Sequence, residues 1–184
     1  MKILRAAVYL NLVLLAASAR TFGQATLSSE PAKSCREVAQ DFYDWYVPIV
    51  LKEQESDASD VALRDKPSVF SPELIRALNE DSQAQQKADG DLVGLDFDPF
   101  LNTQDPAQHY VLRDVSAKGD KCLVDVHSID SGRTSPKPNV VAELARKDGK
   151  WRFVNFHYGK SQWSADENLI DTLKKLREDR EQHK

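Results

Sequence analysis

The sequence lacks the short motifs that mark many enzymes and nucleotide-binding proteins. Its 184 residues contain no P-loop, no GxGxxG, no CxxC pair, no HExxH and no GxSxG. These motifs mark phosphate binding, metal-dependent proteolysis and nucleophilic hydrolysis. The sequence therefore gives no support for any of these activities. We assign no catalytic residue, expect no cofactor and no resident metal, and favour a binding protein over an enzyme.

An excess of positive charge is also missing. Lys plus Arg number 25 against 29 Asp plus Glu, which gives a net charge of −4, and the isoelectric point is near 5.6. Nucleic-acid-binding domains usually show a basic patch or stripe. We therefore expect no nucleic-acid partner.

The apolar run at the start of the chain is too short for a membrane span. Residues 6–17 form an apolar stretch of about a dozen residues behind Lys2 and Arg5, whereas a spanning helix needs about 20. Small residues allow cleavage after Ala19 or Ala25. This pattern is typical of a secretory signal peptide, and an uncleaved membrane anchor is the alternative.

We accordingly predict that residues 1–25 are a signal peptide and that the mature protein is periplasmic or secreted, without membrane contact. Cleavage removes Lys2, Arg5 and Arg20 from the 25 basic residues and no acids, which leaves 22 against 29 and a net charge of −7. Such a charge suits a basic partner.

Cysteine is scarce, with only Cys35 and Cys122 in the whole chain. An even number of cysteines in an exported protein favours a disulfide, and two buried thiols are the alternative. The bond would close a loop of about ninety residues and stabilise the fold by about 4–5 kcal/mol.

The first half of the mature chain shows helical spacing. After a polar lead at residues 26–33, residues 34–37 match the S-x-x-E capping box and apolar residues recur behind them at helical intervals. Pro48 should kink or end this helix. Residues 53–67 are predicted to be a loop, and Ser71 followed by proline marks a second helix start.

The second half is rich in Val, Tyr, Phe and Trp, which favours strands at residues 109–115, 122–129, 139–146 and 151–158. Asp148-Gly149 predicts a type I′ hairpin, and a last capping box at Ser164 precedes an amphipathic helix. The order predicts an α+β fold: N-terminal helices packed on a curved antiparallel sheet of about four strands, with a C-terminal helix. We expect a single domain over residues 34–180.

The hairpin register suggests a pocket. A two-residue turn pairs Arg146 with Trp151, Leu144 with Phe153, Ala142 with Asn155 and Val140 with His157 on one face of the sheet. Asn155 and His157 then form the polar end of that face, with Asp125 and His127 from a neighbouring strand as candidate companions. Satisfied internal hydrogen bonds are the simpler interpretation, and a pocket floor is the alternative.

An acidic segment offers a second candidate site. Asp96, Asp98 and Asp105 lie within ten residues, and clustered carboxylates can bind Ca²⁺. The segment departs from the EF-hand pattern after its first two acids. Turn capping by these aspartates is therefore the favoured explanation.

Three strings together resemble a known family. They are DFYDWYV at residues 41–47, DFDPFLNTQD at 96–105 and KWRFVNFHY at 150–158. They resemble the bacterial exported family catalogued as domain of unknown function 3828, over roughly residues 34–178. The resemblance implies a fold similar to the nuclear-transport-factor-2-like or cystatin-like class, often with a cone-shaped pocket. It implies no activity and no catalytic residues, and such folds host many functions.

Three functional hypotheses follow. The first is a non-enzymatic module that binds a protein or a small ligand, in an inhibitor or immunity-like role among others. The second is a small hydrolase or isomerase that uses Asn155, His157 and Asp125. The third is a Ca²⁺-binding protein that uses Asp96, Asp98 and Asp105.

Overall fold

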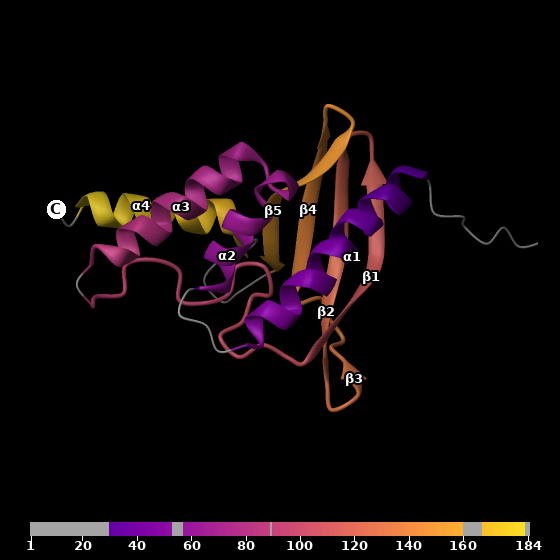
Figure 1. The fold of residues 1–184 in the computed structure, drawn as a ribbon, viewed down its shortest axis with the longest axis horizontal. Helices are drawn as coiled ribbons and strands as arrows, with labels where there is room; N and C mark the ends of the chain where they lie inside the picture. The colour runs from indigo at the N-terminus through magenta and orange to yellow at the C-terminus, as the bar shows by residue number, and fades with distance from the viewer. Residues whose placement is uncertain (1–29, 53–56, 89, 160–166, 183–184) are drawn as a thin grey trace, which may run out of the picture.

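The structure is a computed structural model that describes residues 30–52, 57–88, 90–159 and 167–182 (Figure 1). The predicted signal peptide and the capping box at Ser164 lie outside the described residues. The elements, in chain order, are α1 Glu30–Val50, α2 Ala58–Asp65, the 3₁₀ turn η1 Pro67–Val69, α3 Pro72–Gln86, β1 His109–Lys118, β2 Lys121–Asp130, β3 Arg133–Thr134, β4 Val140–Lys147, β5 Lys150–Gly159, β6 Glu167–Asn168 and α4 Leu169–Gln182.

The strands form one antiparallel sheet in the order β1-β2-β4-β5-β6, and the two-residue strand β3 pairs with β2. Figure 1 shows α1 crossing one face of this sheet, while α3 and α4 lie side by side beyond β5. The predicted α+β architecture is confirmed. No helix among the described residues is long and apolar enough to cross a membrane.

The core lies between α1 and the sheet. Phe42 of α1 is 1% exposed, and its ring centroid is 4.9 Å from that of Phe153 on β5 and 5.4 Å from that of Phe70. Cys35 of α1 and Cys122 of β2 are both fully buried and form the predicted disulfide, with an S–S distance of 2.10 Å. Helix and sheet are therefore joined covalently as well as by packing.

Two helix predictions need correction. α1 begins at Glu30, before the predicted capping box. Ser34 lies inside the helix, where its hydroxyl donates to the Pro31 carbonyl and accepts from Trp151 Nε1 at 3.0 Å. The segment predicted as a loop contains α2, because Val61 and its two successors are apolar and bury against the core. The Ser71 N-cap is confirmed, since its hydroxyl accepts from Leu74 N.

A β-bulge overturns the predicted hairpin register. The turn is type I′ as expected, with φ of 52° at Asp148 and 76° at Gly149, and Arg146 pairs with Trp151 and Leu144 with Phe153. The register then shifts between Glu143 and Leu144, so that Asn155 pairs with Glu143 and His157 with Val141. The predicted pairs Ala142–Asn155 and Val140–His157 are wrong, because one extra residue in β5 reverses the faces beyond it.

The bulge allows two aromatic residues of β5 to be buried in the core. Phe153 and Phe156 are both fully buried, and their rings stack with centroids 5.3 Å apart. Without an extra residue, two positions three apart in a strand would face opposite sides. The bulge thus places both rings inside and turns His157 away from the core.

Candidate functional site

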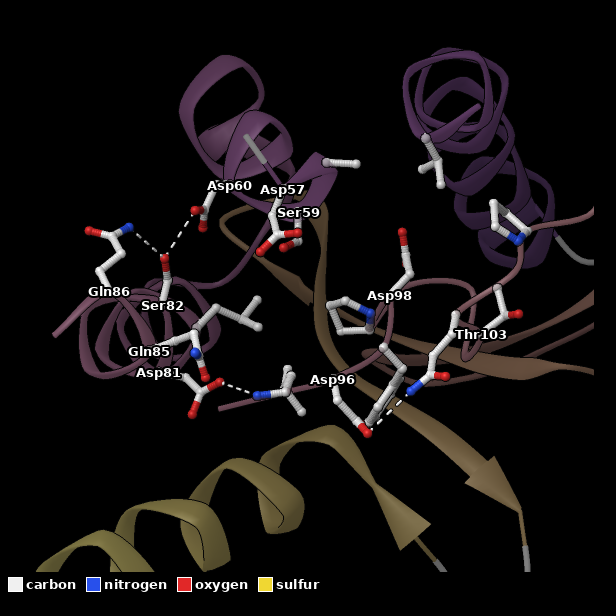
Figure 2. Close-up of a pocket in the computed structure, with 18 of the residues that line it drawn as sticks. Asp57, Ser59, Asp60, Asp81, Ser82, Gln85, Gln86, Asp96, Asp98 and Thr103 are labelled. Atoms are coloured by element: carbon white, nitrogen blue, oxygen red, sulfur yellow. Dashed lines mark hydrogen bonds between the residues drawn. The ribbon is translucent and has the colours of Figure 1, made fainter. Parts of the chain in front are cut away.

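A pocket of about 570 Å³ opens between the start of α2, one face of α3 and the loop at residues 95–106 (Figure 2). We call it the acidic pocket, because its charged lining residues are one lysine and five aspartates: Lys52, Asp57, Asp60, Asp81, Asp96 and Asp98. Three separate chain segments supply these carboxylates, so the pocket exists only in the folded protein.

Asp81 forms the buried wall of the acidic pocket. It is 4% exposed, and its Oδ1 accepts from Arg180 of α4 at 2.6 Å while its Oδ2 accepts from Leu95 N at 2.8 Å. The backbone passes so close here that a Cβ on Gly94 would lie 2.9 Å from Asp81 Oδ2. A side chain at position 94 would therefore displace Asp81 from these hydrogen bonds or shift the loop.

Gln85 of α3 anchors the adjoining loop. Its side-chain oxygen accepts from Val93 N and Gly94 N, both at 3.0 Å, and its Nε2 donates to the Asp91 carbonyl at 2.9 Å. One amide thus satisfies three backbone groups of the loop, which holds the rim of the acidic pocket against α3.

Asp98 organises the floor of the pocket. Its Oδ1 accepts from Phe100 N and Leu101 N at 2.9 and 3.0 Å, and its Oδ2 accepts from the Tyr46 hydroxyl at 2.6 Å. Burial raises the pKa of Asp98 to about 6, although these three hydrogen bonds lower it; the nearby negative charge of Asp57 adds to the rise.

Tyrosine hydroxyls fasten the same loop to the core. Tyr43 donates to the Phe100 carbonyl and Tyr158 to the Pro99 carbonyl, both at 3.0 Å. The three sequence strings that suggested a family resemblance therefore contact one another, because these tyrosines come from the first and third strings and the loop is the second.

The aspartates considered for Ca²⁺ have separate environments. Asp98 caps a turn, Asp96 accepts from Gln104 Nε2 at 3.2 Å, and the Asp105 carbonyl accepts from the Thr103 hydroxyl at 2.8 Å. Within the described ranges, no group of three or more His, Cys, Asp or Glu side chains is placed to hold a metal ion. The structure does not bring the three together as a ligand set.

The sheet face opposite α1 carries a different cluster. His157 Nε2 lies 2.7 Å from Glu143 Oε2, and Lys121 Nζ lies 2.7 Å from Glu143 Oε1. Desolvation raises the pKa of Glu143, but the hydrogen bonds from Lys121 and His157 outweigh it and hold the pKa below its usual value. Sequence reasoning missed Glu143, because its contact with His157 depends on the bulge.

The other predicted pocket residues do not converge. Asp125 pairs with Val141, and Val141 pairs with His157, so a whole strand separates Asp125 from His157. Asn155 bonds Asn168 and accepts from Ile170 N, which helps to begin α4.

His127 is 4% exposed and bonds the Ser135 carbonyl through Nδ1 at 2.9 Å. Its Nε2 is buried without a partner among the described residues. None of the predicted residues Asn155, His157, His127 and Asp125 lines the acidic pocket.

The chain has only a distant similarity to known proteins. No family model and no curated protein matches the chain, so the resemblance to domain of unknown function 3828 stays a prediction. A solved chain that resembles it comes from the crystal structure of the type VI native effector–immunity complex Tae3–Tai3 from Ralstonia pickettii. The two share 22% identity with a TM-score of 0.44, over 65% of this chain and 89% of the other. Similarity at this level is too low to transfer function.

Proposed function

We propose that the protein is an exported, non-enzymatic binding module whose partner is a basic protein, with the acidic pocket receiving a cationic side chain. The observation that carries the proposal is the charge of the lining: apart from Asp81, which pairs with Arg180, four carboxylates lie against one ammonium group. Such a concave, single-sign surface concentrates groups of opposite charge.

The pocket holds carboxylate oxygens that the fold leaves available. The side chain of Asp57 forms no hydrogen bond within the described residues, and Asp60 accepts one, from the Ser82 hydroxyl at 3.0 Å. Asp57 directly precedes α2 and Asp60 lies in its first turn, and both line the pocket. An arginine guanidinium binds two carboxylate oxygens well through its planar fork.

Apolar residues complete a site for a long cationic side chain. Leu78, Leu95 and Phe97 line the same pocket, and the methylene stem of lysine or arginine packs on apolar surface while its charged head reaches polar groups. A small anion would be repelled by the carboxylates of the same lining.

The exported location and the binding role fit together. The disulfide Cys35–Cys122 is the kind of bond that persists outside the cytoplasm. A rigid module of this kind would act by occupying its partner, as inhibitor and immunity proteins do. We extend the proposal to that role and to cleavage of residues 1–25.

The test compares partner capture by two variants that remove equal charge. Mature wild-type protein, D57N/D60N and the control E37Q/D41N, whose two residues are exposed on α1, are each used to capture proteins from a native periplasmic extract. We expect basic proteins to be retained by the wild type and the control and reduced at least tenfold by D57N/D60N. Retention of the same partners by D57N/D60N, or capture of acidic partners alone, would refute the proposal.

A further inference from the structure

Helix α3 separates the acidic pocket from a second hollow of different character. This hollow has a volume of about 910 Å³ and is lined by Phe70, Pro72, Ile75, Arg76 and Arg152 among others. We call it the arginine groove. Positions 72, 75, 76 and 79 recur at helical spacing on one face of α3, whereas Leu78, Asp81, Ser82 and Gln85 of the acidic pocket occupy another face.

The groove lies beside β5, at the start of α3. Phe70 forms a parallel bridge with Phe153 of β5, and Ser71 N donates to the Phe153 carbonyl at 2.8 Å. These contacts hold the start of α3 beside β5 and bring Arg152 of β5 to the same hollow as Arg76 of α3. Exposed Pro72 and half-buried Ile75 contribute apolar surface to the same hollow, whereas Phe70 is only 1% exposed and offers almost none.

The guanidinium groups of both arginines are free of hydrogen bonds within the described residues, although Arg76 is near enough to Glu73 to interact with it electrostatically. Within the described part of the chain, neither Arg76 nor Arg152 forms an ion pair or a side-chain hydrogen bond. The acid in the lining, Glu80, is directed to Arg177 of α4 at 3.5 Å. The groove therefore presents positive charge, on a protein whose net charge is −4.

We propose that the arginine groove binds an acidic peptide segment of a partner protein, in which an apolar side chain neighbours a carboxylate. The apolar side chain would pack on Pro72 and Ile75, and the carboxylate would accept from Arg76 and Arg152. Charge complementarity carries this assignment, because a guanidinium without a carboxylate partner is satisfied best by a bidentate one. The groove prefers the opposite charge to the acidic pocket, so the inference goes beyond the proposed function and can fail independently of it.

The test measures binding of a defined peptide. An eight-residue fluorescent peptide with Leu and Phe set among Asp and Glu is titrated with mature protein by fluorescence anisotropy at low salt, beside the same peptide with Asn and Gln in place of the acids. We expect saturable binding of the acidic peptide and at least tenfold weaker binding of the amide form. R76Q/R152Q should weaken the acidic peptide at least tenfold.

Two controls separate the groove from general charge effects. R133Q/K137Q removes the same charge from the exposed segment around β3 and should leave affinity unchanged, as should D57N/D60N. I75D, with folding verified by circular dichroism, should abolish binding by placing an acid on the groove floor.

Several results would overturn the proposal. They are absence of binding, equal binding of the amide peptide, and an unchanged affinity for R76Q/R152Q. A further contradicting result would come from analytical ultracentrifugation. If the wild type self-associates and R76Q/R152Q does not, the groove binds a second copy of this chain and the peptide partner is rejected.

Discussion

Replacing Asp98 with asparagine should raise the free energy of unfolding at neutral and alkaline pH. The folded state holds the pKa of Asp98 at about 6 against an ordinary value of 3.8. Because the folded pKa is raised, the protonated carboxyl favours folding below pH 3.8, and this contribution is lost as pH rises through about 6. At about 1.36 kcal/mol per pKa unit, the full loss is at most about 3 kcal/mol, reduced by the side chain's remaining contact with solvent.

Asparagine can preserve the local geometry without the charge. Its Oδ1 accepts from Phe100 N and Leu101 N as Asp98 does now, and its Nδ2 donates to the Tyr46 oxygen in place of the present bond from the hydroxyl. The stability gain of D98N over wild type should therefore be about 1 kcal/mol at pH 4.5 and up to about 3 kcal/mol at pH 8.

Urea denaturation followed by tryptophan fluorescence at pH 4.5, 6 and 8 measures this difference. D41N, on the exposed side of α1, is the matched control and should show no comparable pH-dependent gain. A D98N protein that is less stable than wild type at every pH, or whose gain does not grow with pH, would refute the assignment of a desolvated carboxyl at this position.

Three further predictions concern stability and are measured by the same denaturation assay at pH 7. C35A/C122A should lower the free energy of unfolding by about 4 kcal/mol, and an equal stability of oxidised and reduced wild type would contradict this. G94A should cost about 1–3 kcal/mol, because its Cβ would meet Asp81 Oδ2 at 2.9 Å, and a loss below about 0.5 kcal/mol would contradict this steric argument. R180Q should cost about 3 kcal/mol by leaving buried Asp81 without its ion-pair partner; a loss below about 0.5 kcal/mol would show that the Arg180–Asp81 pair does not stabilise the fold.

Local signals in the sequence predicted local structure well. Ser71 before a proline begins α3, and Asp148-Gly149 forms the type I′ turn, because each depends on the conformational preferences of adjacent residues. Capping of a turn by Asp98 was likewise the preferred explanation of the acidic segment, and its carboxylate bonds backbone N–H groups two and three residues ahead.

Predictions that depended on strand register or on packing between distant segments were wrong or could not be made. The turn predicted the register of β4 against β5 correctly only as far as Leu144. Beyond that residue the bulge, which lets Phe153 and Phe156 both enter the core, makes Val141 the partner of His157. α2 was missed because its eight residues gain stability from packing more than from propensity.

The sequence by itself determined the succession of N-terminal helices, antiparallel strands and a C-terminal helix, the pairing of Cys35 with Cys122 and the acidic character of the protein. These features depend on neighbours along the chain, on composition and on an even cysteine count. Only the tertiary structure decided the two hollows on either side of α3. Asp81 meets Arg180 across 99 residues, and Arg76 and Arg152 line one hollow because Phe70 is held against β5. Contacts between distant segments are selected by burial in three dimensions, and no local pattern encodes them.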